Sequence, residues 1–123
     1  MSQNARLRNS ADFRAVYVKG RRLEGHLMTV FILANGLEQH RLGITASRKM
    51  ARHAVDRNRA KRLIREAFRL SRAELNDFKD KYDWVFNARR SIIEVKLDAV
   101  VKELRLVFTQ VMQSEPKDIS KRS

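Results

Sequence analysis

The sequence predicts an α+β fold with the element order α-β-β-β-α-β-α, although the pattern also allows two strands before the second helix. Two kinds of apolar pattern support this prediction. The segment LMTVFIL alternates between two faces, as a strand does. Two later segments repeat apolar residues every three or four positions, as core-facing helices do.

Length and composition predict one globular domain over residues 1–123, with flexible tails at about 1–8 and 114–123. The chain is 43% hydrophobic and has one Pro and four Gly, as expected for a compact core. The absence of cysteine excludes disulfides, thiolate catalysis and cysteine-based metal sites. No apolar run reaches the roughly 18 residues of a membrane span. The N-terminus has no hydrophobic signal core, so a cytoplasmic protein is expected.

The first predicted helix covers residues 10–18. Ser10 is a candidate N-cap, and Gly20 is placed to end the helix. Phe13, Val16 and Tyr17 share one side of it. The basic residues before the helix are expected to form an arm outside the domain.

Strand character runs from residue 22 to residue 33, with a kink expected at Gly25. Asn35-Gly36 lies in a polar turn and predicts a hairpin into a further strand, RLGITAS. One face of the first strand carries Thr29, Phe31 and Leu33, and the other carries Met28, Val30 and Ile32.

The second helix is predicted from a stripe of apolar residues that recurs with helical spacing. Arg57, Lys61, Arg65 and Arg69 step by four along another line and form a basic ridge about 18 Å long. The apolar stripe consists of Ala60, Leu63, Ile64, Ala67 and Phe68.

A strand at residues 82–89 and a last helix complete the predicted fold. The strand follows an acidic loop, and Pro116 begins a polar tail after the helix. The apolar stripe of the last helix consists of Leu97, Val100, Val101, Leu104, Phe108 and Val111.

Basic residues are concentrated between Arg41 and Arg72. This stretch holds eleven basic and two acidic residues, so it carries +9 of the chain's net charge of +13. Charge of one sign packed this densely repels itself and persists where a polyanion neutralises it. Most of the cations are arginines, whose guanidinium groups bind phosphate oxygens in pairs. A solvated basic face is the alternative, but such faces usually mix charge signs, so RNA or DNA is the expected partner.

Four residues have two interpretations each. Asn58 is expected in the first turn of the second helix, where it can be a capping or surface residue, or its amide can bond a base edge or neighbouring RNA. Phe13, Tyr17 and Phe31 can be core residues or a platform on which unpaired bases stack beside a positive groove.

The titratable residues form no convincing catalytic or metal-binding set. The three histidines are scattered without ligand spacing, and no serine lies in a nucleophile-elbow context. The acids between residues 74 and 83 have nearly helical spacing and could attract a divalent ion, although a solvated face is the simpler interpretation. We predict no catalytic residue and no metal ligand in the protein itself.

The segment AVDRNRAKRLIREAFR, residues 54–69, closely resembles the signature of the protein subunit of bacterial ribonuclease P. The preceding strand RLGITASRK and the upstream segment DFRAVYVKG also resemble that family, over about residues 7–112 in all. One difference is local. Many members have a glycine before the second helix, where this chain has MARHA at residues 50–54.

This resemblance implies an α/β sandwich with a left-handed strand-helix-strand crossover, against the usual right-handed preference. It also implies binding of a large catalytic RNA and, in a cleft between the first helix and the sheet, of the 5′ leader of precursor tRNA. The RNA subunit with bound Mg²⁺ would make the cut that frees the mature 5′ end of the tRNA. No obligate protein partner and no membrane association are expected.

The matching positions define the expected site. The leader-binding aromatics are Phe13, Tyr17 and Phe31. The RNA-binding residues are Arg48, Lys49, Arg52, Arg57, Asn58, Arg59, Lys61, Arg62, Arg65 and Arg69.

Two other functions are compatible with the charge and size. A small ribosome-associated or single-strand RNA-binding protein without a nuclease partner is the main alternative. A helix-turn-helix DNA-binding protein is less compatible, because the residues before Arg57 resemble a strand and a loop rather than a first helix.

Overall fold

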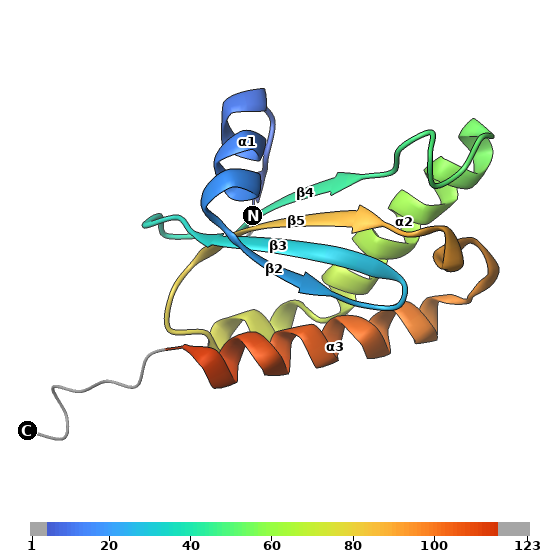
Figure 1. Ribbon diagram of the computed structural model, residues 1–123. Coiled ribbons are helices and arrows are strands. Elements are labelled where there is room, and N and C mark those ends of the chain that lie inside the picture. The colour runs from blue at the N-terminus through green and yellow to red at the C-terminus, as the bar shows by residue number, and fades with distance from the viewer. Residues whose placement is uncertain (1–4, 116–123) are drawn as a thin grey trace, which may run out of the picture.

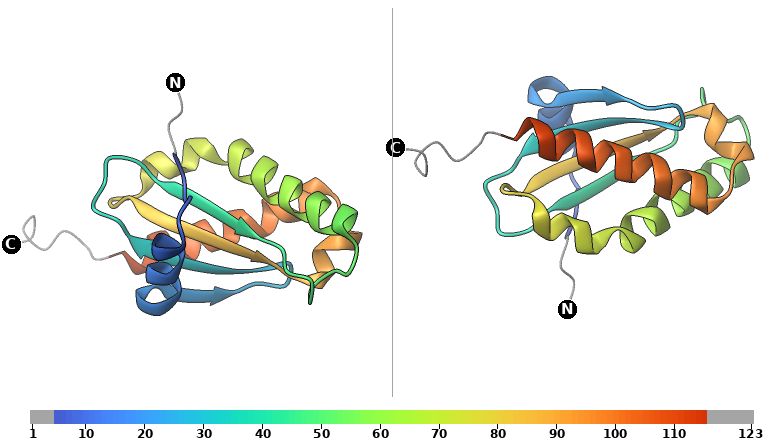
Figure 2. Two further views of the ribbon diagram at one scale, coloured as in Figure 1. Left: turned by 90° about the horizontal axis from the view of Figure 1, so that it is seen from above. Right: turned by 90° about the horizontal axis from the view of Figure 1, so that it is seen from below.

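The computed structural model describes residues 5–115, which form one five-stranded sheet with helices on both faces (Figure 1). The strands are β1 (Ala5–Arg6), β2 (Arg21–Glu24), β3 (Met28–Ala34), β4 (Arg41–Thr45) and β5 (Tyr82–Ala88). The helices are α1 (Ser10–Lys19), α2 (Ala54–Leu70) and α3 (Leu97–Ser114), with short 3₁₀ helices η1 (Arg72–Asp77) and η2 (Arg90–Glu94). α1 lies on one face of the sheet, and α2 and α3 cover the other (Figures 1 and 2). The predicted fold class and element order are confirmed, with β1 as an additional strand.

β1 makes the N-terminal tail shorter than the predicted residues 1–8. It pairs in parallel with β4, and the backbone N–H of Leu7 donates to the carbonyl of Leu42 at 2.9 Å. The side chain of Leu7 is buried in the small core beneath α1. The prediction is therefore wrong for residues 5–7, because strand pairing and burial hold them on the sheet. The predicted C-terminal tail is also wrong for residues 114 and 115, because Ser114 ends α3 and Glu115 accepts a hydrogen bond from the hydroxyl of Tyr82 at 2.7 Å. Residues 1–4 and 116–123 of the predicted tails lie outside the described residues.

β5 occupies the centre of the sheet, although it is the last strand in the sequence. The strand order is β1-β4-β5-β3-β2, with β5 antiparallel to β3 and parallel to β4. The predicted turn forms, since Gly36 has a φ of +67° and the Asn35 side chain accepts from the N–H of Leu37 at 2.8 Å. The predicted hairpin pairing is wrong, because β5 inserts between β3 and β4. Six of the seven side chains of β5 are buried, as expected for a central strand covered on both faces.

The first predicted strand is divided at Gly25 into β2 and β3, which form an antiparallel hairpin. The N–H groups of the hairpin turn are directed at the carboxylate of Glu103 on α3, at 2.9–3.1 Å. A β-carbon on Gly25 would collide with this carboxylate and lie 2.8 Å from the carbonyl oxygen of Met28. The expected kink is therefore a tight turn fastened to α3.

β4 and β5 are parallel neighbours joined through α2, which makes a strand-helix-strand crossover. In the left view of Figure 2 both strands point the same way and α2 lies beyond the sheet. When this view is turned so that both strands point up, with α2 on the far face of the sheet, β5 lies to the right of β4. This arrangement makes the crossover left-handed. The handedness implied by the family resemblance is confirmed.

The main core lies between the sheet and the two long helices. Phe68 of α2 contacts Trp84 and Phe86 of β5 and Phe108 of α3, with ring centroids 5.8–6.4 Å apart. The predicted stripes of α2 and α3 are confirmed, except that Leu63, Leu97 and Val101 are only half-buried. A smaller core beneath α1 consists of Leu7, Val16 and Val85, with Phe13, Phe31 and Leu33 packed against it.

The two ends of α1 depend on the side chain of Asn9 and on a close approach between Gly20 and β3. Asn9, rather than the predicted Ser10, is the N-cap, and its side chain accepts from the N–H of Asp12 at 2.8 Å. Gly20 ends the helix as predicted, but with a φ of −80° it is not in the left-handed region. A β-carbon at Gly20 would lie 2.5 Å from the carbonyl oxygen of Ile32 on β3. Glycine is therefore required because β3 passes so close.

Gly20→Ala is expected to lower the free energy of unfolding by about 1–3 kcal/mol, because the added methyl group must displace the backbone of α1 or β3. Urea unfolding measures the change. Gly36→Asn is the matched control, since that site faces open space and Asn tolerates a positive φ; its effect should stay within about 0.5 kcal/mol. Equal losses of stability in the two variants would mean that the close approach of β3 to Gly20 is not the cause.

Candidate nucleic-acid interface

α2 places its apolar stripe in the core and a line of polar side chains in solvent. The predicted ridge, which begins at Arg57 and steps by four, does not stay on the exposed side. Each step of four turns about 40° beyond a full turn, so the ridge starts half-buried and becomes exposed only at Arg65. The line that faces solvent along the whole helix consists of Asn58, Arg62, Arg65 and Arg69.

Arg57 and Arg59 hold neighbouring segments of the chain. Arg57 donates through Nη1 to the carbonyl oxygens of Ala51 at 3.0 Å and Arg52 at 2.8 Å. Arg59 donates to the carbonyl oxygens of Ile93 at 2.8 Å and Val95 at 2.9 Å. These two predicted RNA-binding arginines are therefore engaged in fastening the β4–α2 loop and the segment after η2 onto α2.

Asn58 lies one turn further into α2 than predicted. The helix begins at Ala54, and its N-cap, His53, makes no side-chain capping bond. Asn58 is exposed in the second turn. The capping interpretation is wrong because the helix starts earlier than the sequence pattern indicated. The exposure of Asn58 is compatible with both a surface residue and a residue that contacts RNA.

The loop between β4 and α2 has three exposed cations and two buried apolar residues. Met50 and Ala51 are each 7% exposed and pack in the main core. Arg48, Lys49 and Arg52 are exposed around them. Met50 and Ala51 thus anchor the loop, while its cations face solvent.

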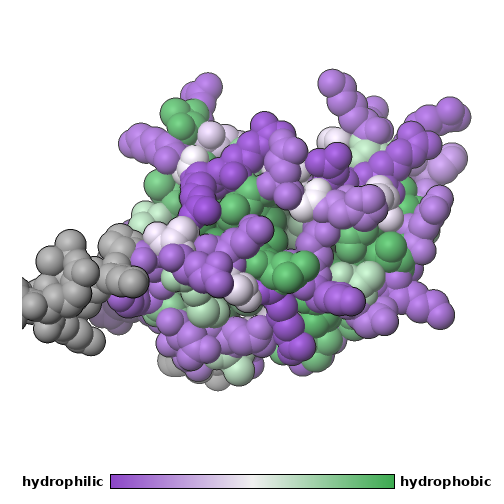
Figure 3. Space-filling model, turned by 60° about the horizontal axis from the view of Figure 1, so that its bottom comes forward, coloured by the Kyte–Doolittle hydropathy of each residue, from purple (hydrophilic) through white to green (hydrophobic). Residues whose placement is uncertain are grey.

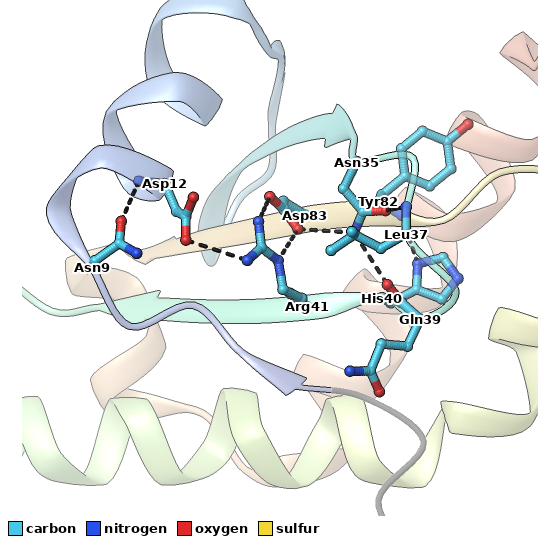
Figure 4. Close-up of polar contacts among 9 residues, drawn as sticks. All are labelled: Asn9, Asp12, Asn35, Leu37, Gln39, His40, Arg41, Tyr82 and Asp83. Atoms are coloured by element: carbon cyan, nitrogen blue, oxygen red, sulfur yellow. Dashed lines mark hydrogen bonds and ion pairs between the residues drawn. The ribbon is translucent and has the colours of Figure 1, made fainter.

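Two other arginines of the basic stretch are paired with acids. Arg69 forms an ion pair with Glu66, and the hydrogen bond from Arg69 lowers the pKa of the Glu66 carboxyl group. Arg41 forms a bidentate pair with the buried Asp83, at 2.8 and 2.7 Å, and reaches Asp12 of α1 at 3.2 Å (Figure 4). Its pKa is raised, chiefly by the hydrogen bonds to Asp83. Arg41 therefore contributes to holding α1 on the sheet.

The acids between residues 74 and 83 do not converge on one point. Asp83 is buried against Arg41, whereas Glu74 lies 3.4 Å from Arg105 of α3. Among residues 5–115 no group of three His, Asp or Glu side chains is placed to hold a metal ion. The expected solvated face is therefore wrong for Asp83, which is buried in an ion pair, whereas Asp77 and Asp80 are exposed as expected.

His40 is buried and makes hydrogen bonds within the fold. It is 2% exposed, and its Nδ1 accepts from the N–H of Tyr82 and from Nε1 of Trp84, each at 3.0 Å. Burial, aided by the nearby charge of Lys81, lowers the pKa of His40. Nδ1 of the ring therefore acts as an acceptor that joins the residue before β4 to β5 (Figure 4).

The three predicted cleft aromatics separate into two environments. Phe13 is half-buried over Gly43 in the small core, as the core interpretation expects. Tyr17 is 39% exposed and meets half-buried Phe31 edge to face, with ring centroids 4.9 Å apart. Tyr17 and Phe31 thus form an accessible aromatic pair where α1 meets the sheet.

Sequence reasoning missed three polar residues beside this pair. Asn87 of β5 accepts hydrogen bonds from the hydroxyls of Tyr17 and Thr45. The guanidinium carbon of Arg22 lies 5.8 Å from the centre of the Phe31 ring, at cation–π distance. These residues come from β5, β4 and β2, and only the strand register brings them together.

A second surface feature lies on the opposite side of the molecule, between α2 and α3. Figure 3 shows this side, where hydrophilic side chains surround smaller apolar patches. A largely apolar groove of about 580 Å³ is lined there by Leu70, Leu97, Val101 and Leu106, with charged side chains at its rim. None of the described helices is apolar over a length that would cross a membrane.

The accessible aromatic pair where α1 meets the sheet, together with the cations of the loop and α2, is typical of a nucleic-acid-binding protein. The family model described as Ribonuclease P matches residues 1–112. The chain therefore belongs to the ribonuclease P protein family, the RNA-binding subunits of the ribonucleoprotein that processes the 5′ end of tRNA. Its partner is the RNA of ribonuclease P. The alternatives of a ribosome-associated protein and a helix-turn-helix protein are set aside by this result.

Relatives and solved structures agree with this assignment. The ribonuclease P protein component of Alkaliphilus metalliredigens is 35% identical over 114 residues, covering 87% of this chain and 99% of the relative. That of Desulfotalea psychrophila is 46% identical over 89 residues, covering 72% and 71%. The Staphylococcus aureus RNase P protein has a TM-score of 0.74 at 27% identity, covering 90% and 96%. The Thermotoga maritima protein has a TM-score of 0.74 at 28% identity, covering 85% and 96%.

Proposed function

We propose that the surface around Tyr17 and Phe31, where α1 meets the sheet, is a leader cleft that binds the single-stranded 5′ leader of precursor tRNA. The observation that carries the proposal is the accessible pair formed by Tyr17 and Phe31 beside the cation of Arg22. Unpaired bases stack on such aromatic faces, and neighbouring cations neutralise the phosphates. Phe13 then supports the cleft from the small core, and Arg41 with Asp12 and Asp83 holds its α1 wall in place.

The outward cations of the β4–α2 loop and of α2 bind, in this proposal, the phosphate backbone of the ribonuclease P RNA. This surface is held in place by Arg57 and Arg59, which bond backbone carbonyls, and half-buried Lys61 lies beside them. The N–H groups of these side chains that are not used within the protein can bond RNA. The residues that face RNA directly are Arg48, Lys49, Arg52, Asn58, Arg62, Arg65 and Arg69.

The two regions are connected by the chain itself. Thr45 ends β4 within the cleft, and Arg48 follows three residues later on the basic loop. An RNA strand leaving the cleft along β4 would therefore meet the loop cations before it reaches α2. This continuity supports a protein that holds the leader and the catalytic RNA at the same time.

The chemistry of cleavage belongs, in this proposal, to the RNA subunit, with Mg²⁺ activating the attacking water. The exposed groups of the protein interface are guanidinium, ammonium and amide groups. Guanidinium and ammonium groups are hydrogen-bond donors with no lone pair for a metal ion, so these cations bind phosphates and base edges. The protein contributes positioning of the leader and charge neutralisation, and we expect it to do so in the cytoplasm.

Tyr17→Ala tests the leader site in the holoenzyme reconstituted with its RNA. The substitution is expected to cost about 1–3 kcal/mol of binding to precursor tRNA with a leader, and little for tRNA without one. Val18→Ala is the control, since that neighbouring side chain is 72% exposed and lies outside the cleft pair. Equal losses for both RNAs, or a loss explained by a lower melting temperature, would assign Tyr17 to packing alone.

A further inference from the structure

We propose that Asn87 is a specificity-determining residue that reads one base of the leader by donating a hydrogen bond from its side-chain nitrogen. This inference rests on the proposed leader cleft and names the group within it that distinguishes bases. The ligand is an unpaired nucleotide stacked beside Tyr17 and Phe31. The group that is recognised is an acceptor, a carbonyl oxygen or ring nitrogen, on the edge of its base.

Two hydroxyl groups determine how the amide of Asn87 is oriented. The hydroxyl of Tyr17 donates to Oδ1 at 2.9 Å, and the hydroxyl of Thr45 donates to the same atom at 2.7 Å. An amide oxygen has two lone pairs, so these bonds use its acceptor capacity. Turning the amide over would break both bonds, unless both hydroxyls became acceptors.

The side-chain nitrogen of Asn87 is consequently the group presented to a ligand. It makes no hydrogen bond within residues 5–115, and it is not buried. Because this nitrogen is open to solvent, a base acceptor can bond it directly. Because the oxygen is already occupied, Asn87 acts here as a donor only, unlike an unconstrained asparagine, which offers both a donor and an acceptor.

The strand register places this donor next to the aromatic pair. Asn87 lies opposite Thr29 of β3 and Thr45 of β4. The next position on the same face of β3 is Phe31, which contacts Tyr17. A base stacked on this pair would direct its edge along the sheet toward Asn87, while Arg22 at the rim of Phe31 would be near its phosphate.

The test compares precursor tRNAs that carry each of the four bases at each leader position, bound to the reconstituted holoenzyme. Wild-type protein is expected to prefer some bases at one position by about 3- to 10-fold, the worth of one hydrogen bond. Asn87→Ala should reduce this preference to within about twofold, while binding to leaderless tRNA stays unchanged. Asn87→Asp replaces the donor with acceptors and should reverse the order of the bases, whatever its effect on absolute affinity.

A second variant tests the orienting hydroxyls without removing the amide. The double substitution Tyr17→Phe with Thr45→Val keeps the ring and the side-chain shape but releases Oδ1. The amide can then turn, so the base preference should weaken while the preference for a leader is retained. This variant keeps the inference testable if Asn87→Ala does not fold.

The results separate this inference from the proposed function. If wild-type protein does not distinguish tRNA with and without a leader, the leader cleft itself is wrong. If it does, but shows no base preference or keeps the same preference in Asn87→Ala, the reading role of Asn87 is overturned and the cleft remains. An equal loss for leaderless tRNA in Asn87→Ala would also overturn it, because the residue would then act through the fold.

Discussion

Raising the salt concentration from about 50 to 200 mM is expected to weaken binding of the ribonuclease P RNA by about a thousandfold. A protein that neutralises about six phosphates releases the counterions condensed on them, and added salt opposes that release. The exposed arginines and lysine of the proposed surface match this number. They are Arg48, Lys49, Arg52, Arg62, Arg65 and Arg69.

The measurement is the dissociation constant over a series of salt concentrations at fixed Mg²⁺. A plot of log affinity against log salt should be linear, and Arg65→Ala should make its slope shallower by about one unit. Lys102→Ala on α3 is the control, because this exposed lysine lies beside the apolar groove and on a different helix from Arg65. A salt-insensitive affinity, or equal changes in slope for both variants, would contradict the proposed RNA surface.

Phe68→Ala is expected to lower the free energy of unfolding by about 3–5 kcal/mol. The ring of Phe68 is 4% exposed and contacts three aromatic rings from β5 and α3. Removing it leaves a cavity at the junction of the sheet and both long helices, and the neighbouring rings can fill that space only in part. Leu63→Ala should cost less, because Leu63 is only half-buried.

Arg65→Ala provides the comparison for Phe68→Ala on the same helix. Arg65 is exposed, so its substitution should change stability by no more than about 0.5 kcal/mol while weakening RNA binding. Urea or thermal unfolding of the free protein separates the two effects. Similar unfolding curves for both variants would mean that the assignment of core and RNA faces on α2 is wrong.

Local patterns predicted the elements well, because each element depends on neighbours in the sequence. The alternation in β3 and the stripe from Ala60 to Phe68 indicate which side chains face the core. The turn at Asn35 and Gly36 was also predicted correctly, since its conformation depends on those residues. The strand paired with β3 was not, because a turn sets the direction of the chain and not which strand, among all those formed later, lies beside it.

The candidate site also has some features that the sequence predicts and others that it does not. The density of cations between Arg41 and Arg72 is a property of the sequence, and so is the preference for a polyanion that follows from it. Composition does not say which cations are available. Arg57 and Arg59 hold backbone carbonyls, Arg41 is paired with Asp83, and Arg62 and Arg65 are exposed.

By itself, the sequence determined the class of fold, the order of its elements, the basic segment and the family, since all of these depend on composition or on residues close together in the chain. Tertiary structure alone decided the central position of β5, the left-handed crossover and the meeting of Tyr17, Thr45 and Asn87. The physical reason is that hydrogen-bond partners and burial are set by contacts between residues far apart in sequence. Tyr17 and Asn87 are 70 positions apart, and no local pattern connects their side chains.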